Sequence, residues 1–72
     1  MKMVEQLRRL KGMTLQIELK NSGTVVTGTV SSVDMSRNMH LETVQLTING
    51  KESVSMDHIT IRSKQIKLIA LP

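Results

Sequence analysis

Histidine, cysteine and acidic side chains supply most metal ligands and acid–base catalysts, and this sequence offers few of them. Its 72 residues include no cysteine, two histidines and six acidic residues. The histidines, His40 and His58, are 18 positions apart, in no spacing typical of metal ligands. The sequence holds no Gly-rich phosphate loop and no convincing pair of catalytic carboxylates. It therefore predicts neither an enzyme nor a metal or cofactor site.

Basic side chains outnumber acidic ones and indicate the kind of partner. Ten Lys and Arg against six Asp and Glu give a net charge of +4, with an isoelectric point near 10.0. A surface of this sign suits a polyanion. The chain contains no Phe, Tyr or Trp, although many single-strand nucleic-acid-binding proteins stack bases on aromatic rings. A nucleic-acid partner would have to be held in another way.

The length allows one small domain, which we expect to span residues 1–72. A chain of this size buries only about 60% of the surface that its unfolded form exposes. Such domains usually add disulfides, a metal or oligomerisation, and without cysteine oligomerisation is the remaining choice. We expect an intracellular protein with no membrane contact. No apolar run approaches the roughly 18 residues of a transmembrane helix, and the N-terminus lacks a signal peptide's apolar core.

Hydrophobic periodicity predicts a short helix followed by five strands. A helical stripe of apolar residues spans 2–11 and stops at Gly12. From Met13 the period becomes two, which is typical of strands with one buried face. The predicted strands cover residues 13–20, 25–33, 39–48, 54–61 and 65–71.

Turn residues and breaks in the alternation indicate that the sheet is curved. Asn49-Gly50 is a strong hairpin signal, and Asn21 to Gly23 predicts a tight turn. The alternation slips near Glu42-Thr43 and again near Asp57-His58, which we interpret as β-bulges. Gly28 within the second strand indicates a bend or bulge. We therefore expect a mainly β fold, a small and strongly bent barrel.

The last strand of this barrel is predicted to be an apolar edge. One of its faces is expected to carry Ile66, Leu68 and Ala70, with Ile69 on the other. Bare apolar edges are an aggregation hazard. Pairing between subunits would cover them, and head-to-tail pairing of the fourth strand with the fifth gives a ring if it closes.

Two motifs carry a family resemblance that covers essentially the whole chain. The residues of the first are Gly23, Val26, Gly28, Val30, Asp34, Asn38 and Leu41. The second, usually Ile-Arg-Gly before an apolar strand, appears as Ile61-Arg62-Ser63 followed by Ile66. In these motifs the sequence resembles the Sm and Sm-like family of RNA-binding proteins. The opening Met-Lys-x-Val, the run 17–21 and the final Leu71-Pro72 look like the D-type members of this family.

The resemblance implies a short N-terminal helix on a five-stranded, bent antiparallel SH3-like barrel. It also implies a seven-membered ring, built by pairing strand four of one subunit with strand five of the next, around uridine-rich single-stranded RNA. For a D-type protein it implies a heteroheptamer on small nuclear RNA in the spliceosomal ribonucleoprotein core. The expected neighbours are the second D-type and the B-type proteins. The expected location is the nucleus, with assembly in the cytoplasm.

The resemblance further implies two loops that meet around one nucleotide. The residues that it assigns to RNA are Ser36, Arg37, Asn38, Arg62, Ser63 and Lys64. An amide such as Asn38 can match the O4 and N3–H of uracil together, and the guanidinium of Arg62 can stack on the base. Ser36 stands where many family members carry an aromatic ring. We therefore expect hydrogen bonding and guanidinium stacking in place of ring stacking.

Several of these residues also have purely structural interpretations. Asp34 is expected to shape its loop, because Asx side chains hydrogen-bond their own turn. We interpret Gly23 and Gly28 as structural. For His40 we expect loop packing or an exposed polar contact, and for His58 a place in a bulge.

Two departures from the family pattern leave other functions open. Ser63 replaces the motif glycine, so its loop should reach positive φ less easily. The chain also stops at Pro72, where D-type proteins usually continue into a Gly- and Arg-rich tail. Arg37 and Lys64 fit solvated surface cations as well as RNA contacts. The alternatives are a protein-interaction scaffold with a vestigial pocket, motivated by Ser36 and Ser63, and a homo-oligomeric Sm-like RNA chaperone.

Overall fold

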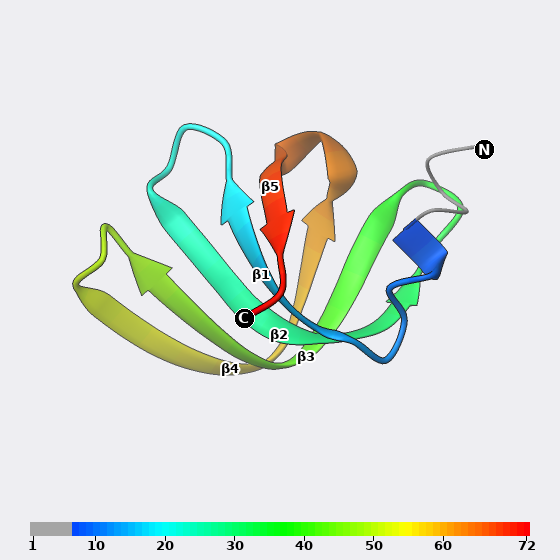
Figure 1. Cartoon of the computed structure of the whole chain (residues 1–72), viewed down its shortest axis with the longest axis horizontal. Helices are drawn as coiled ribbons and strands as arrows, with labels where there is room; N and C mark the ends of the chain where they lie inside the picture. Colours follow the sequence, from blue (N-terminus) through cyan, green and yellow to red (C-terminus); the bar gives the residue numbers. More distant parts are fainter. Residues whose placement is uncertain (1–6) are drawn as a thin grey trace.

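The computed structural model describes residues 7–72 and contains one antiparallel sheet of five strands. Its elements are β1 (Thr14–Leu19), β2 (Thr24–Val33), β3 (Asn38–Ile48), β4 (Glu52–Arg62), the 3₁₀ turn η1 (Ser63–Gln65) and β5 (Ile66–Ala70). The strand order is β4-β3-β2-β1-β5. Figure 1 shows the long strands β2, β3 and β4 bending beneath β1 and β5. The predicted mainly β fold of five bent antiparallel strands is confirmed.

The predicted helix over residues 2–11 lies partly outside the described residues. In the described part, Leu7 and Arg8 are helical, and the Leu10 N–H donates to the Leu7 carbonyl at 3.0 Å. Gly12 then adopts a positive φ of 85°, and its N–H donates to the Val30 carbonyl of β2 at 2.7 Å. This bond attaches the segment to the sheet. Within residues 7–72 no helix has the length and apolar character needed to cross a membrane.

The core lies on the inner face of the bent sheet, because apolar and polar residues alternate along its inner strands. The buried residues are Leu7, Leu15, Ile17, Val26, Val30, Val33, Met39, Leu41, Val44 and Ile61. Full burial of such a side chain contributes roughly 1.5–3 kcal/mol. No polar or charged side chain is buried in the part of the chain that the structure describes.

Two of the predicted irregularities meet at one bulge between β2 and β3. The register shifts between Thr27 and Thr29, and Thr43 on the opposing strand has a φ of 52°. A Cβ atom on Gly28 would lie 3.2 Å from the Glu42 carbonyl oxygen. The absence of a side chain at Gly28 therefore lets the two strands approach where the sheet bends. The bulge predicted at Glu42-Thr43 is confirmed.

The second predicted bulge, at Asp57-His58, is wrong. β3 and β4 keep one register along their length, with His58 opposite Glu42. The alternation slip in β4 lies directly across from the slip in β3, so both strands change phase together without an extra residue between them. His58 is therefore a paired strand residue and not a bulge residue.

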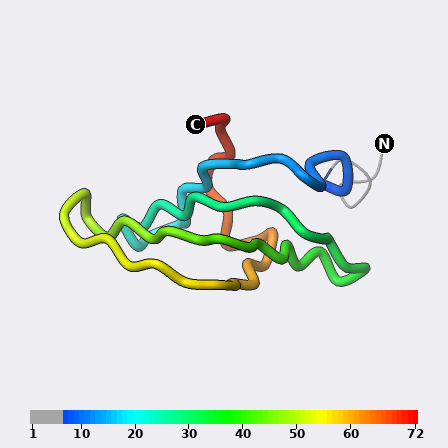
Figure 2. The backbone as a smooth tube through the Cα atoms, turned by 90° about the horizontal axis from the view of Figure 1, so that it is seen from below, coloured from blue at the N-terminus to red at the C-terminus, as the bar shows by residue number. Residues whose placement is uncertain are grey.

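The prediction that Ile66 and Leu68 share one face of the last strand, with Ile69 on the other, is also wrong. Ile66 and Ile69 pack against the core, whereas the side chain of Leu68 points outward and is 57% exposed. The cause is a register shift in the pairing of β1 with β5, between Glu18 and Leu19. In Figure 2 the C-terminal strand runs steeply across the direction of the longer strands.

The two edges of the described sheet are β4 and β5. β4 leaves Val54 44% and Met56 38% exposed, and β5 leaves Leu68 exposed. Both edges therefore combine free backbone groups with apolar side chains. That combination favours pairing with another strand.

Candidate functional site

The six residues that the sequence motifs assign to RNA line a single open cavity of about 570 Å³. It lies where the β2–β3 loop faces the turn after β4, and the two segments are seen at the right and top of Figure 1. The cavity is lined by Met35, Ser36, Arg37, Asn38, Arg62, Ser63 and Lys64. Met35 is the lining residue that sequence reasoning missed. Its position inside the Asp34–Asn38 loop was the available signal.

Strand pairing and one backbone hydrogen bond bring the two halves of the cavity together. Asn38 begins β3 directly opposite Arg62 at the end of β4. Beyond this pair, the Ser63 N–H donates to the Arg37 carbonyl at 2.9 Å. The loop and the turn are therefore attached to each other and to the end of the same strand pair.

The carboxylate of Asp34 builds the first loop. Its Oδ1 accepts the backbone N–H groups of Ser36 and Asn38, each at 2.9 Å. The loop is also closed by backbone bonds between Asp34 and Asn38 at 3.0 Å and between Arg37 and Asp34 at 3.1 Å. Arg37 takes the positive φ of 65° that the tight loop requires.

These hydrogen bonds keep Asp34 ionised. The backbone N–H of Asn38 is the main reason that the pKa of Asp34 lies below its ordinary value of 3.8. Partial desolvation opposes this effect, and side-chain bonds from His40 and Asn38 add to it. The loop therefore holds a carboxylate that only accepts hydrogen bonds at neutral pH.

The same carboxylate orients the side chain of Asn38. The Asn38 Nδ2 donates to Asp34 Oδ2 at 3.1 Å, so the amide nitrogen faces the carboxylate and the amide oxygen faces away from it. The edge left for a ligand carries one acceptor, Oδ1, and one N–H donor. Uracil presents the complementary pair, N3–H and O4.

Cations stand on the other wall of the cavity. Arg62 and Lys64 are exposed and flank the half-buried Ser63. The Arg62 backbone has φ −76° and ψ 139°, and its N–H donates to Gln65 Oε1 at 3.2 Å. Ser63 does not have a positive φ. The turn is a 3₁₀ helix, a conformation that serine can adopt, so the turn does not require the glycine of the family motif.

Ser36 offers no aromatic ring on which a base could stack, but the neighbouring residue Met35 carries a thioether. Met35 is 77% exposed, and the Arg8 Nη2 lies 2.9 Å from its Sδ. The N-terminal segment thus adds a third arginine near the loop, after Arg37 and Arg62. The cavity is rich in cations and hydrogen-bond donors.

The two motif glycines lie away from the cavity. Gly23 occupies the β1–β2 turn with a φ of 66°, and its carbonyl accepts the Asn49 N–H at 2.9 Å. Gly28 sits at the bulge between β2 and β3. Their contacts are with backbone and neighbouring strands, which matches a structural role.

A family model described as the LSM domain matches residues 5–71. Similar solved structures include a heptameric archaeal Sm protein, 20% identical with a TM-score of 0.74, covering 94% of this chain and 97% of that one. An Sm protein of Pyrococcus abyssii in complex with a uridine heptamer is 18% identical with a TM-score of 0.76, and 97% of each chain is covered. A chain of the NatC complex bound to Gag peptide and CoA is 24% identical with a TM-score of 0.77, covering 92% of this chain and 90% of that one. At these identities the structures establish the fold. Because the family model spans nearly all of the sequence, this chain belongs to the LSm family, and its bent five-stranded sheet is the Sm fold.

Proposed function

We propose that this chain is an RNA-binding subunit of an Sm-type ring and that its cavity holds one uracil of a single-stranded RNA. The observation that carries the proposal is the Asn38 amide, held in one orientation by Asp34 directly opposite Arg62. Asn38 would pair with the edge of the base, and the guanidinium of Arg62 would stack on its face. Lys64 would approach the phosphate as a point charge.

The proposed activity is binding and involves no catalysis. Asp34 lies beside the cavity but does not line it, and its carboxylate already accepts hydrogen bonds from its own loop. Its role is to present Asn38 and shape the loop. The residues that line the cavity supply charge, hydrogen bonds and a planar cation, which are the groups that nucleotide recognition needs.

The ring would be completed through the two sheet edges. β4 and β5 each carry free backbone groups and exposed apolar side chains, and head-to-tail pairing of one with the other generates a closed ring. In support, an archaeal Sm protein of this fold is heptameric, and the Pyrococcus protein was solved with a uridine heptamer.

The sequence motifs support a finer form of this proposal. In that form the chain is a D-type subunit of a heteroheptamer and lies between the second D-type and the B-type neighbours. The ring would bind uridine-rich small nuclear RNA in the spliceosomal core. The ring would assemble in the cytoplasm and act in the nucleus. Native mass spectrometry of the chain, alone and mixed with those neighbours, tests this assignment. A stable homo-heptamer that ignores the neighbours would favour the Sm-like chaperone instead.

Uracil binding is tested with Asn38→Ala and Arg62→Ala in the assembled ring. Loss of a stacking contact costs roughly 1–3 kcal/mol, so Arg62→Ala should weaken oligouridine binding by about 5- to 150-fold. Asn38→Ala should lower the preference for uracil more than it lowers overall affinity. Both rings should stay intact by native mass spectrometry. Tight oligouridine binding by the isolated monomer would contradict the proposal.

A scaffold role is the second candidate, and the similarity to a chain of the NatC complex favours it. In that role the fold would hold other proteins together and the cavity would stay empty of RNA. Photo-crosslinking in cell extract separates the two functions. RNA crosslinked to the loop around Ser36 supports the proposed function, and protein crosslinks without RNA support the scaffold.

A further inference from the structure

The uracil-reading pair stands at the end of a ladder of outward-facing residues on β3 and β4. Asn38 pairs with Arg62, and the next outward pair along the same two strands is His40 with Thr60. Met39, between the two β3 residues, is fully buried on the opposite face, as the two-residue period of a strand requires. His40 and Thr60 therefore lie directly behind the pocket, one step along the ladder.

Both ring nitrogens of His40 have partners. Nδ1 lies 3.0 Å from Thr60 Oγ1, and Nε2 lies 3.1 Å from Asp34 Oδ2. An ionised carboxylate only accepts hydrogen bonds, so Nε2 carries a proton. In the neutral ring Nδ1 is then the acceptor for the Thr60 hydroxyl. The Ser31 hydroxyl also donates to the His40 carbonyl at 3.0 Å and fixes the backbone.

The acceptor of the His40 bond is the oxygen that orients Asn38. Asp34 Oδ2 accepts both the His40 Nε2–H and the Asn38 Nδ2–H, while Oδ1 serves the loop backbone. Without the histidine, Oδ2 would lose one of its two donors, and only the Asn38 Nδ2–H would hold it in place, although Oδ1 would keep its backbone bonds. The Asn38 amide would then be held less firmly, and its flipped form, in which acceptor and donor are exchanged, would cost less free energy. A flipped amide suits cytosine, whose N3 accepts and whose amino group donates.

We propose that His40 and Thr60 are positioning residues that hold the Asn38 amide in the uracil-reading orientation and so set discrimination against cytosine. The chain of bonds runs from the Thr60 hydroxyl through the imidazole to Asp34 and then to Asn38. Neither residue lines the cavity, so their effect is on selectivity. This inference rests on the proposed function of the same site.

The test compares the affinities of the assembled ring for heptameric oligouridine and oligocytidine, measured by fluorescence anisotropy. One hydrogen bond is worth about 0.5–1.5 kcal/mol. His40→Ala should therefore lower the uridine-to-cytidine affinity ratio by about three- to tenfold, and Thr60→Val by about two- to threefold. Thr60→Ser, which keeps the hydroxyl, should restore the ratio. His58→Ala is the matched control, because His58 is the other histidine and lies on the same ladder opposite Glu42.

The outcomes separate this inference from the proposed function. If Asn38→Ala lowers the ratio and His40→Ala leaves it unchanged, the positioning role is overturned and uracil binding stands. An equal loss of affinity for both RNAs in His40→Ala, with a lower melting temperature, would show a role in stability alone and also overturns it. If the wild-type ring has no preference for oligouridine and Asn38→Ala changes nothing, the proposed function itself is wrong. Native mass spectrometry on each variant verifies that the ring is present.

Discussion

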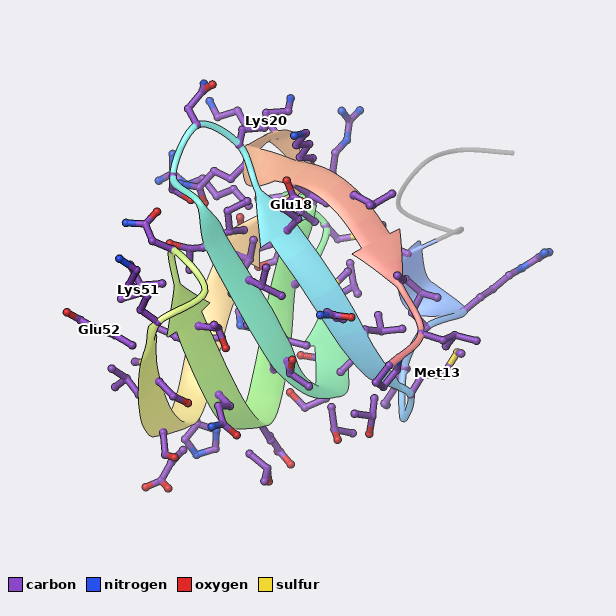
Figure 3. All side chains as sticks on the ribbon, turned by 60° about the vertical axis from the view of Figure 1, so that its left-hand side comes forward. Met13, Glu18, Lys20, Lys51 and Glu52 are labelled. Carbon is purple, nitrogen blue, oxygen red and sulfur yellow. The ribbon has the colours of Figure 1, made fainter. Side chains whose placement is uncertain are left out.

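The two ends of the bent sheet are built in different ways. At one end the β1–β2 turn meets the β3–β4 hairpin, and backbone conformation holds them. Positive φ angles occur there at Asn21, Gly23, Asn49 and Gly50, and the contact between the two turns is a backbone bond from the Asn49 N–H to the Gly23 carbonyl. Figure 3 shows the side chains that follow the hairpin turn, Lys51 and Glu52, pointing away from the molecule.

At the other end a backbone bond also joins the two segments, but side-chain hydrogen bonds shape the loop. The carboxylate of Asp34 closes one loop, orients Asn38 and accepts from His40, and the facing turn contributes Arg62. An end built from backbone conformation tolerates few residue types, since only Gly and Asn reach positive φ at low cost. An end built from side-chain bonds can change its ligand preference by substitution while the fold persists. Substitutions at each end test this contrast.

The largest expected effect is at the backbone end, for Gly23→Ala. A Cβ at this left-handed φ would collide with Asn49 Oδ1, the end of an exposed side chain that can rotate away, and we expect the variant to lose about 1–2 kcal/mol of unfolding free energy, mainly from strain at φ. Urea denaturation of the assembled protein measures the loss. Gly50→Ala is the control, because its φ is 69° but no atom lies within 4 Å of the added Cβ; it should lose about 1 kcal/mol. Equal losses would mean that the contact with Asn49 is irrelevant.

The next largest effect is at the side-chain end, where Asp34→Ala and Asp34→Asn should differ. Asparagine keeps one acceptor oxygen for the backbone N–H groups of the loop, so Asp34→Asn should keep the wild-type fold with only a small loss of stability. It would place an amide nitrogen against the nitrogen of Asn38, and uracil-over-cytosine selectivity should fall about tenfold. Asp34→Ala should lose selectivity and also melt at a lower temperature. Unchanged selectivity in Asp34→Asn would contradict the orientation of Asn38 described above.

A smaller effect is expected from acid. The pKa of Asp34 in the folded chain lies below 3.8, so the folded state binds fewer protons than the unfolded state as the pH passes through this range. The stability that the carboxylate contributes is then fully present above the unfolded value and is lost as the pH falls through the folded pKa. The stability difference between wild type and Asp34→Asn should be constant from pH 7 to about pH 5 and shrink below pH 3.8. A change between pH 5 and pH 7 would contradict the assignment to Asp34.

The smallest effect is expected beside the β1–β2 turn, at the ion pair that joins β5 to β1. The Lys67 Nζ lies 3.1 Å from Glu18 Oε2, with the side chains 65% and 39% exposed, and Figure 3 shows Glu18 on β1 beside β5. Exposed pairs of this kind contribute about 0.2–1 kcal/mol. Lys67→Gln should therefore shift the urea midpoint slightly, and 1 M salt should abolish the shift. Lys51→Gln is the control, and a larger effect there would contradict the ranking.

The sequence predicts most of the fold because alternation directly reports which face of a strand is buried. It succeeds for β1, β2 and β3 and finds the bulge at Glu42-Thr43. It fails for β5, because the face that Leu68 occupies depends on a register shift against β1, far away in the chain. It fails at His58 because the hydrophobic alternation of one strand shifts in the same way whether or not the alternation of its partner shifts with it, and a bulge is present only where the partner's alternation does not shift.

The candidate site was predictable in composition but not in geometry. All six motif-assigned residues line one cavity, since two family motifs mark the loops that meet there. The bonds from His40 to Asp34 and Thr60 leave no local pattern, because they depend on how the loop folds back beside β3 and on which residues face each other across β3 and β4. Pairing of that kind is a tertiary property that spacing within one strand does not encode.

The order of the strands also has a kinetic consequence. Three of the four pairings join strands that follow each other in sequence, whereas β1 and β5 bring together residues as distant as Gln16 and Ala70. Closing so long a segment loses more chain entropy than closing a hairpin, and such long-range contacts tend to form late in folding. β5 should therefore dock after the meander of β1 to β4 has formed. β5 is one of the two edge strands by which a ring would assemble. A subunit in which β5 has not yet docked would lack one of these edges. Ring assembly would therefore select for subunits that have completed folding.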